Sequence, residues 1–492
     1  MSKKICTVGI DIGTTSVKTI ALNKNGQEID SGSFNLELSN NNEGAAEQDP
    51  DAVYQAVIIA LSILCPKIKS KGYTIAQVGL SSAMHSLLLV SGEGRPLTKA
   101  MTWMDNRAKK HAQELWISKE GKSIYKRTGT PIHPMSPLTK LVWLREVHPE
   151  LFEQAIHFVS LKEWIWYQWF KVWEIDASMA SATGLYNLDL QEWDKDALAC
   201  AGISPEQLSK IVPTTHIRKE IQDQKMIDLG FDTEINFNIG ASDGVLANLG
   251  LGAIEKDVMA ITIGTSCALR MGSSKPVTDE KTRSFCYVLD QGKFIVGGPS
   301  NSGGIVVERL YNQILGGRKQ DFGQFLTQVG NTELAEDLIC LPYMVGERAP
   351  LWNADAKAAW IGLQLHHTSA HILRATVEGI LFNAYWIASN LFEKVGIPRK
   401  IVASGGLLKI PWIREDLAHI FNIPVEYREE GDASTLGAIF LAEMASGIRG
   451  WDAISQTNVE INLAFPDETK HAKYQKKFKN FRNYVRALEL EG

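Results

Sequence analysis

Two stretches of this sequence, about half a chain apart, repeat one strand-turn-strand pattern. Residues 8–19 read VGIDIGTTSVKT, and residues 258–271 read VMAITIGTSCALRM. In both, an apolar run typical of a β-strand ends in Ile-Gly-Thr and a second hydroxyl residue, and another apolar run follows. Either motif alone is weak evidence, but two copies in one setting indicate a duplicated fold. A phosphate chain held from both sides by such hairpins would place a nucleotide between two similar domains.

The turn of the first hairpin carries groups that suit phosphate and metal. Gly13 lets the backbone approach a phosphate where a Cβ would clash, and the neighbouring hydroxyls and amides can hold phosphate oxygens. Asp11, at the end of the first strand, is placed to hold a magnesium ion through water. The residues expected at the nucleotide phosphates are Thr14, Thr15 and Lys18 in the first hairpin and Gly264, Thr265 and Ser266 in the second.

The length of the chain, 492 residues, predicts two or three domains. Because the second hairpin opens a new domain, we place the boundary near residues 252–256 and expect domains at 1–254 and 255–492. The net charge of −5 gives no indication of a nucleic-acid partner. Six scattered cysteines without a CxxC pair argue for a reducing cytosol and against a zinc site or a disulfide framework.

The sequence predicts no membrane segment. The first strand begins within the first few residues, which leaves no room for a signal peptide. A helix is expected from Pro50 to about Cys65, and its ten-residue apolar run before Pro66 is too short to cross a bilayer. We therefore expect a cytoplasmic protein with no membrane partner.

Polar and aromatic side chains gather where predicted strands end. One strand ends in the segment SSAMH at residues 81–85, and another run ends in TWMDNR at residues 102–107. Ligands of α/β sheets collect at strand ends. The candidate ligand-binding residues are therefore His85, Trp103, Asp105 and Arg107.

Asp243 follows a third predicted strand, in the sequence GASDG at residues 240–244. It could cap the helix that begins there. It could instead be a general base, because the glycines on either side would let a substrate come close. Position alone supports the two interpretations equally.

Two glycine-rich stretches could face a nucleotide. Residues 297–304 lead into a helix whose start, at Gly303 and Gly304, suits phosphate, although a plain turn would have the same composition. Gly405 and Gly406, between a strand and a helix, suggest a backbone platform for a nucleotide base. Three further stretches favour structural roles: a Trp-rich core or subunit-interface helix at 161–173, a Ser/Thr-rich loop at 176–187, and an amphipathic helix at 470–486 docked on the second domain.

Together these segments resemble the FGGY carbohydrate kinases of the actin, hexokinase and sugar-kinase superfamily, over essentially the whole chain. DIGTTSVK at residues 11–18 and TIGTS at 262–266 resemble the two phosphate hairpins of that family. Asp243 matches its catalytic base. Residues 346–350 (GERAP), residues 358–378 and Gly405-Gly406 also match its pattern.

The resemblance implies a duplicated, two-domain α/β fold of the actin-like ATPase (ribonuclease H-like) type, with ATP and magnesium in the interdomain cleft. It also implies a sugar pocket that includes the Met84-His85 pair. Domain closure would exclude water, which otherwise competes as the phosphoryl acceptor.

Within the family, four segments most resemble the branch that phosphorylates gluconate: residues 81–88, 102–108, 127–135 (RTGTPIHPM) and 239–250. The expected reaction is transfer from ATP to the terminal hydroxyl of D-gluconate, which gives 6-phosphogluconate. A sugar acid carries a carboxylate, which favours a cation or several donors. The candidates are Arg107 first, then His133 in the RTGTPIHPM segment, and Lys162 last.

Two alternatives remain open at this stage. One is another FGGY substrate such as xylulose, because xylulose kinases share the Met-His pair and the base. The other is an actin-like ATPase that uses hydrolysis to change shape and needs no sugar pocket. The sequence leaves the oligomeric state open, with a homodimer as one option.

Overall fold

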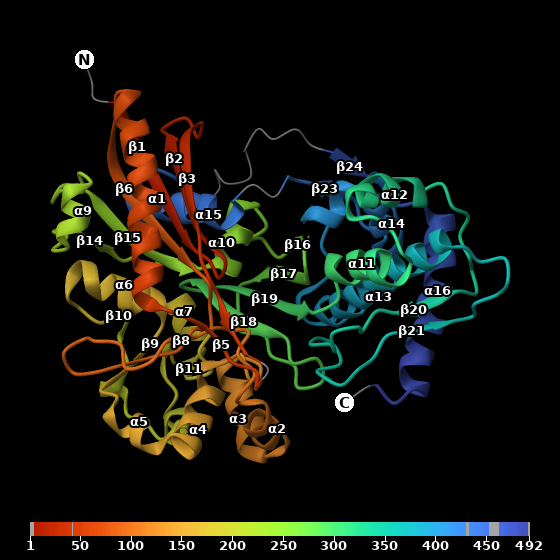
Figure 1. The fold of residues 1–492 in the computed structure, drawn as a ribbon, viewed down its shortest axis with the longest axis horizontal. Helices are drawn as coiled ribbons and strands as arrows, with labels where there is room; N and C mark the ends of the chain where they lie inside the picture. Colours follow the sequence, from red (N-terminus) through yellow and green to blue (C-terminus); the bar gives the residue numbers. More distant parts are fainter. Residues whose placement is uncertain (1–3, 42, 430–431, 452–461, 491–492) are drawn as a thin grey trace.

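The computed structural model describes residues 4–41, 43–429, 432–451 and 462–490. The chain forms two α/β halves side by side, each built on one large twisted sheet (Figure 1). The first half also carries a helical region, drawn in orange to yellow, below its sheet.

The first sheet has six strands in the order β14-β15-β6-β1-β2-β3. β1 pairs antiparallel with β2 and β2 with β3, whereas β1, β6 and β15 are parallel neighbours. The strands are β1 Lys4–Ile12, β2 Ser16–Asn23, β3 Glu28–Asn35, β6 Tyr73–Ser82, β14 Ile217–Arg218 and β15 Asn236–Ser242.

The second sheet has seven strands in the order β18-β19-β17-β16-β22-β23-β24, and it repeats the same pairing pattern. β16 pairs antiparallel with β17 and β17 with β19, whereas β16, β22 and β23 are parallel neighbours. The strands are β16 Val258–Ile263, β17 Cys267–Ser273, β18 Phe285–Asp290, β19 Lys293–Ser300, β22 Lys400–Ser404, β23 Val425–Tyr427 and β24 Asn462–Ala464. The predicted duplicated fold and both hairpins are confirmed, and β18 is an edge strand with no counterpart in the first sheet.

Helix α1 (Pro50–Ser70) is longer than its sequence predicts. Pro66 lies inside its last two turns, although proline removes one backbone hydrogen bond there. Among the described residues, α1 is the one helix long and apolar enough to span a membrane by length and composition, so the prediction that it is too short was wrong. One face of the helix is buried against the first sheet, and this packing supports the helix through the proline.

The helical region of the first half consists mainly of α2 (Lys109–Ile117), α3 (Lys119–Thr128), α4 (Pro137–Val147), α5 (Pro149–Gln154), α6 (Leu161–Phe170), α7 (Ala177–Ser181) and α8 (Lys195–Ala201). Three tryptophans of α6, Trp164, Trp166 and Trp169, are buried in the core, in accord with a structural role. The predicted loop at 176–187 contains the short helix α7, because Asp176 caps it by accepting the backbone N–H of Met179.

In the second half, the long helix α13 (Ser369–Val395) is flanked by α14 (Pro411–Phe421) and α16 (Glu468–Ala487), with α11 (Gly304–Arg309) and α12 (Phe322–Val329) nearby. The predicted docking of the tail helix agrees with the structure. Tyr474, Phe481 and Val485 are buried, and Lys477 reaches Glu378 of α13 at 2.5 Å.

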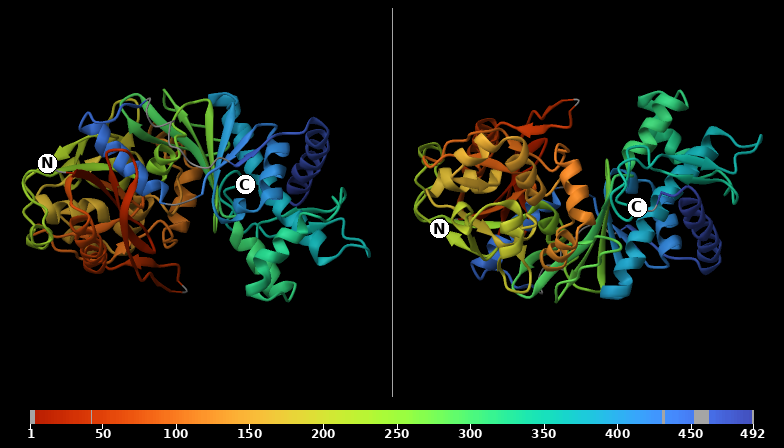
Figure 2. Two further views of the ribbon diagram at one scale, coloured as in Figure 1. Left: turned by 90° about the horizontal axis from the view of Figure 1, so that it is seen from above. Right: turned by 90° about the horizontal axis from the view of Figure 1, so that it is seen from below.

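The helix α15 (Ala433–Ala445) comes from the far end of the chain but packs on the first sheet. In Figure 1 and in both views of Figure 2 it lies beside the N-terminal strands. Two glycines make the close approach possible: a Cβ on Gly79 would lie 2.1 Å from the carbonyl oxygen of Ala438, and one on Gly9 would lie 2.5 Å from that of Thr435. Helix α15 therefore ties the two halves together.

An apolar cluster forms the contact between the halves near α15. It joins α10 (Asp243–Gly250) and α15 to strands β18 and β19 of the second sheet. This interdomain cluster contains Val245, Leu246, Leu249, Phe285, Tyr287, Leu289, Ile295, Ile439 and Phe440. This cluster holds α10 and α15 against the second sheet and so forms one of the contacts between the two halves.

Candidate active site

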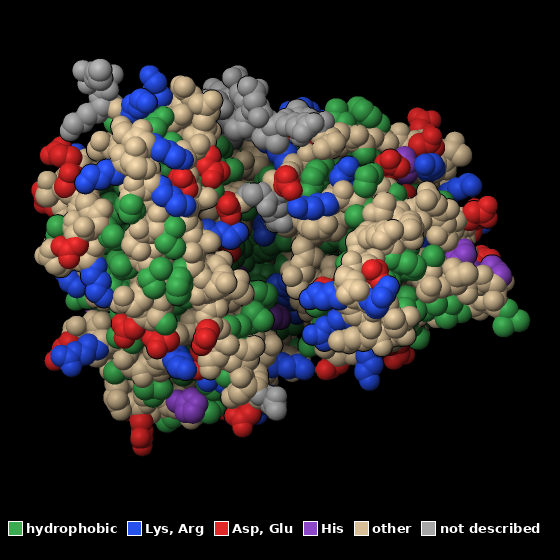
Figure 3. All heavy atoms as spheres, turned by 45° about the horizontal axis from the view of Figure 1, so that its top comes forward, with side chains coloured by type: hydrophobic (Ala, Val, Ile, Leu, Met, Phe, Trp, Pro, Cys, Tyr) green, Lys and Arg blue, Asp and Glu red, His purple; other side chains and the backbone are tan. Residues whose placement is uncertain are grey.

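Two adjoining cavities lie between the halves. The smaller one, of about 280 Å³, is lined from both sides: Met84, His85, Trp103, Met135 and Asp243 come from the first half, and Ser266, Cys267, Ala268, Arg270, Phe285, Tyr287, Pro299 and Arg348 from the second. The larger one, of about 500 Å³, shares Trp103, Met135 and Arg348 with it. The space-filling view shows the molecule hollowed between its halves, with Lys and Arg side chains around the hollow (Figure 3).

Asp243 is the first residue of α10, and Ser242 occupies the N-cap position. Oδ1 of Asp243 accepts the backbone N–H of Gly244 at 2.7 Å. Burial raises the pKa of Asp243 to about 6, with a further rise from the charge of Asp11, while the Gly244 N–H and the charge of Arg270 oppose the rise. A carboxylate in an interdomain cavity with a pKa near neutrality can accept a proton from a hydroxyl group.

Asp11 lies at the end of β1, between groups from distant parts of the chain. Its two oxygens accept hydrogen bonds from the hydroxyls of Ser81, at 2.6 Å, and Ser434 of α15, at 2.8 Å. Burial raises the pKa of Asp11, and these hydroxyls and the charge of Lys18 act in the opposite direction.

The residues around Asp11 fit a magnesium ion that keeps most of its water. Among the described residues no group of three or more His, Cys, Asp or Glu side chains could enclose a metal. Magnesium commonly takes one or two carboxylates plus substrate phosphates and water. Asp11, oriented by the hydroxyls of Ser81 and Ser434, can supply one such carboxylate.

The first hairpin turn is tied to the wall of the smaller cavity. The backbone N–H of Gly13 donates to the carbonyl of Ser16 at 3.0 Å and closes the turn. The indole N–H of Trp103 donates to the hydroxyl of Thr14 at 3.0 Å. This hydrogen bond connects a lining residue of the cavity to the predicted phosphate-binding turn. Lys18 lies on β2, where it pairs with Asp432 at 2.8 Å.

In the second hairpin, the turn at Gly264, Thr265 and Ser266 is held from below by the start of α11. The backbone N–H of Gly304 donates to the carbonyl of Gly264 at 2.7 Å, and that of Ile305 donates to the carbonyl of Thr265 at 3.2 Å. A Cβ on Gly303 would lie 2.6 Å from the backbone of Ser266. The prediction that this helix start offers free amides to a phosphate therefore does not fit, because the hairpin already uses two of them.

Gly405 and Gly406 lie where β22 ends. Gly405 has φ of 103°, and a Cβ there would lie 2.4 Å from the carbonyl oxygen of Ile263, so glycine is required for the close contact with β16. A Cβ on Gly406 would meet no atom within 4 Å. The open side of Gly406 leaves room for a planar ligand.

His85 lines the smaller cavity as a neutral imidazole. Its Nδ1 lies 2.7 Å from the carbonyl oxygen of Ala182, so Nδ1 carries the proton, and Nε2 lies 3.3 Å from the hydroxyl of Tyr287 and can accept from it. Burial lowers the pKa of His85 to about 3.

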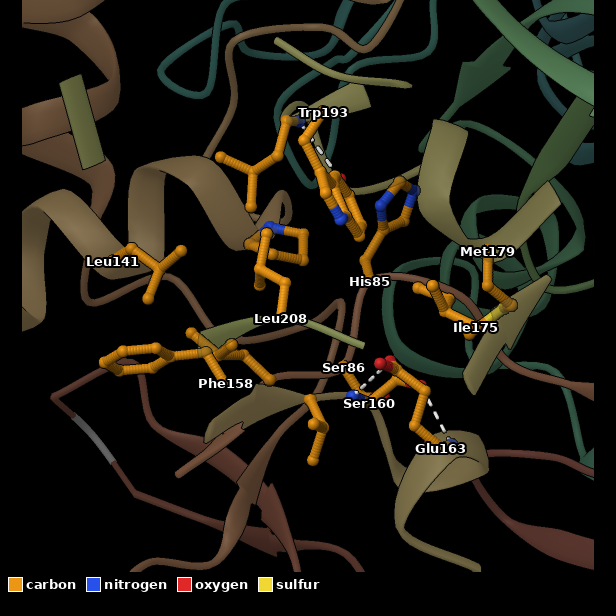
Figure 4. Close-up of a pocket in the computed structure, with 15 residues that line it drawn as sticks. His85, Ser86, Leu141, Phe158, Ser160, Glu163, Ile175, Met179, Trp193 and Leu208 are labelled. Atoms are coloured by element: carbon orange, nitrogen blue, oxygen red, sulfur yellow. Dashed lines mark hydrogen bonds between the residues drawn. The ribbon is translucent and has the colours of Figure 1, made fainter. Parts of the chain in front are cut away.

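Behind His85 lies a small cavity of about 20 Å³, room for one water molecule (Figure 4). In Figure 4 the imidazole lies near Trp193, and Ser160 and Glu163 close the other end with reciprocal hydrogen bonds. The backbone of His85 is held by Lys140 of α4, whose ammonium donates to the carbonyl oxygen of His85 at 2.6 Å.

Two predicted site residues, Arg107 and Asp105, are bound to other side chains and do not face a cavity. The Arg107 guanidinium binds Asp105 through two nitrogens, reaches Glu47 at 2.5 Å, and lies 4.9 Å from the ring of Trp143. Neither Arg107 nor Asp105 lines either cavity. Asp105 also accepts the backbone N–H of Ala46. The first choice for a carboxylate-binding cation is thus already paired.

Lys162 does not fit its predicted role, whereas His133 lies in the wall of a cavity as a neutral side chain. Lys162 is buried, with its ammonium 2.7 Å from Asp176 and 3.1 Å from the carbonyl oxygen of Ala241. His133 does line the larger cavity, but burial lowers its pKa to about 3, so it is neutral and cannot act as a cation.

The sequence reasoning missed the arginines of the second half. Arg270, on β17, and Arg348 both line the smaller cavity, and Arg283 lines the larger one. Arg348 lies within the GERAP segment, whose match to the sugar kinases could have flagged it. No local sequence signal marks Arg270 or Arg283, because their roles depend on how the two halves meet.

The duplicated sheets, the paired hairpins and a buried carboxylate between the halves define a two-domain phosphotransferase fold. The chain matches the FGGY family of carbohydrate kinases, with the N-terminal domain over residues 6–250 and the C-terminal domain over residues 259–446. It therefore belongs to the FGGY family and is a carbohydrate kinase, for which ATP is a substrate. The predicted fold and family are confirmed.

The similar proteins are named for two different substrates, gluconate and xylulose. A gluconokinase of Bacillus licheniformis is 39% identical over 98% of this chain and 96% of its own length. A crystal structure of gluconate kinase from Lactobacillus acidophilus has a TM-score of 0.94 at 36% identity, covering 99% of this chain and 98% of that one. A ligand-bound xylulose kinase from Lactobacillus acidophilus has a TM-score of 0.93 at 35% identity, with the same coverage.

Proposed function

We propose that this enzyme transfers the γ-phosphoryl group of ATP to the terminal hydroxyl of D-gluconate and forms 6-phosphogluconate. The 39% identity to a gluconokinase over nearly the whole length of both chains carries the choice of substrate. The interdomain cavity with Asp243 in it supports the chemistry.

In the proposed mechanism, Asp243 accepts the proton of the attacking hydroxyl. Met84, His85 and Trp103 would orient the sugar, and Nε2 of His85 would accept a hydrogen bond from a sugar hydroxyl in place of the one from Tyr287. Such a reaction needs positioning and charge stabilisation more than covalent help.

The two hairpin turns would hold the nucleotide phosphates through Thr14 and Thr15 on one side and Gly264, Thr265 and Ser266 on the other. Lys18 would add positive charge, and Gly405 with Gly406 would face the adenosine. A magnesium ion, held by Asp11 through water, would neutralise charge on the transferring phosphate. Asp11 is oriented for this by Ser81 and Ser434.

The proposal keeps 1–254 and 255–492 as the two domains. The chain passes from α10 to β16 between Gly250 and Val258, which supports that division, and α15 then crosses back to the first sheet. A cytoplasmic location and a homodimeric assembly complete the proposal. Sedimentation of the purified protein at several concentrations would test the assembly.

The deciding experiment compares substrates on the purified protein with ATP and magnesium: D-gluconate, D-xylulose, glycerol, ribulose and fuculose. We expect the highest kcat/KM with gluconate. Xylulose is the second candidate because of the similar xylulose kinase structure. A higher kcat/KM with xylulose or glycerol would refute the gluconate assignment and leave the kinase family untouched.

A further inference from the structure

The larger interdomain cavity contains a cation held by two tryptophans. Arg283 lies in the segment between β17 and β18, and its guanidinium carbon is 4.3 Å from the ring centre of Trp116 and 5.7 Å from that of Trp352. Trp116 belongs to α2 of the first half, and all three residues line the cavity. Both rings lie within cation–π distance of the guanidinium and attract it electrostatically.

The charge of Arg283 has no anionic partner in the described part of the chain. Neither an ion pair nor a side-chain hydrogen bond engages its guanidinium there. Burial lowers the pKa of Arg283 to about 10, which leaves it charged at neutral pH. A partly buried cation without an anion is costly, so this position favours a negatively charged ligand.

The other cations near the two cavities have partners already. Arg348 donates to the side-chain oxygen of Asn301 at 2.7 Å and to the carbonyl of Ser300 at 3.3 Å. Lys109 pairs with Asp355 at 3.4 Å, and its side chain is half exposed. Arg270 lies beside Asp243 and lowers its pKa, which places it near the hydroxyl that would react.

The position of Arg283 suits one end of a long substrate. The cavity with Arg283 and the cavity with Asp243 adjoin at Trp103, Met135 and Arg348. A ligand with its reactive hydroxyl at Asp243 can therefore extend past Trp103 into the larger cavity. Gluconate carries its carboxylate at the opposite end from its terminal hydroxyl.

We propose that Arg283, held between Trp116 and Trp352, binds the carboxylate of the sugar-acid substrate and selects acids over neutral sugars and polyols. This inference rests on the proposed gluconate kinase activity. Arg283 and Trp352 come from the second half and Trp116 from the first, so the subsite is complete only when the halves are together.

The test compares D-gluconate with D-glucitol, which has the same carbon skeleton and a hydroxymethyl group in place of the carboxylate. Arg283→Met should lower kcat/KM for gluconate about 10- to 100-fold, mainly through KM, because a charged hydrogen bond is lost. It should leave kcat/KM for glucitol and the KM for ATP within about threefold. Arg318→Met is the matched control, because Arg318 is exposed and pairs with Asp321.

Two further variants keep the inference falsifiable. Arg283→Gln replaces the first variant if the methionine form does not fold, and Arg283→Lys, which keeps the charge without the planar fork, should retain part of the preference for gluconate. Equal losses for gluconate and glucitol, or no loss for gluconate, would overturn the carboxylate subsite. A wild-type enzyme that prefers xylulose would instead refute the proposed function, so the two failures are distinguishable.

Discussion

At the scale of single residues, Asp243 is the position on which the chemistry depends. It is not the N-cap of α10, because Ser242 takes that position, and its carboxylate lines the smaller interdomain cavity. The interpretation of Asp243 as the helix cap therefore does not fit the structure, whereas its interpretation as a general base stays a prediction.

We expect Asp243→Asn to fold and bind ATP but to lose about 10²- to 10⁴-fold in kcat, the range typical of a general base. Steady-state kinetics with gluconate and a nucleotide-binding titration measure the two effects. A kcat near the wild-type value in a folded variant would show that Asp243 is structural only.

The pH dependence of kcat/KM should report the same residue. Because burial raises the pKa of Asp243 to about 6, the base is protonated below that pH and activity should fall towards about tenfold per unit. Arg270 opposes the rise, so Arg270→Met should move the acid limb to higher pH. An acid limb near pH 4 in the wild type, or no shift in the variant, would contradict this assignment.

Arg107 provides a contrast with Arg283. Its side chain is 23% exposed and pairs with Asp105, which is 1% exposed. We expect Arg107→Met to lower the free energy of unfolding by about 1.5–3 kcal/mol, because Asp105 is left buried without its cation. Urea denaturation measures the loss, and the KM for gluconate should change less than in Arg283→Met. A large change in KM with unchanged stability would restore the role predicted from sequence.

At this scale the sequence identified three residues that the structure brings to one cavity, His85, Trp103 and Asp243, because each follows a strand end. It failed for Arg107 and Lys162 because a sequence does not reveal which cations already have carboxylate partners. Asp105 and Asp176, the partners that engage these cations, lie 2 and 14 residues away. Arg283 was missed for the complementary reason: its setting forms only where two distant tryptophans meet.

At the scale of elements, local patterns predicted both hairpins and most strands correctly, because apolar runs bounded by turn residues report strands directly. Helix α1 was predicted too short because Pro66 was taken as its end. The packing of α15 was not predicted at all, since its apolar sequence fits either half equally well. The glycines opposite it, Gly9 and Gly79, allow its close approach, and this role is visible only in the folded sheet.

We expect Gly79→Ala to destabilise the protein by about 1–3 kcal/mol, because the added methyl would lie 2.1 Å from the carbonyl oxygen of Ala438. Gly323→Ala in α12 is the matched control, since a Cβ there meets no atom within 4 Å and alanine is the better helix former. The control should be neutral or stabilising by up to about 1 kcal/mol. Equal stability of the two variants in urea denaturation would mean that α15 does not pack closely in solution.

At the scale of the whole molecule, the two halves meet at more than one place. The interdomain cluster and α15 form one contact, and Arg283 of the second half against Trp116 of the first forms another, at the larger cavity. The rings of His133 from the first half and Trp352 from the second also line this cavity and are in contact, with their centres 5.5 Å apart. Domain closure would have to rearrange these contacts.

We expect gluconate and a non-hydrolysable ATP analogue together to reduce the radius of gyration measured by small-angle X-ray scattering, and either ligand alone to reduce it less. Closure excludes water from the transferring phosphoryl group. An unchanged scattering profile with both ligands bound would argue that the structure already has its closed form.

The crossing of α15 has a consequence for how the protein is made. Domains commonly fold one after another as a chain leaves the ribosome. Here the first sheet can form early, but its surface beside Gly9 and Gly79 stays uncovered until residues 433–445 have been translated. Until then Asp11 also lacks the hydroxyl of Ser434 as a hydrogen-bond donor. During that interval the nascent chain exposes apolar surface to chaperones and proteases. Interrupted translation before that helix would thus yield a chain that cellular quality control can recognise as unfinished.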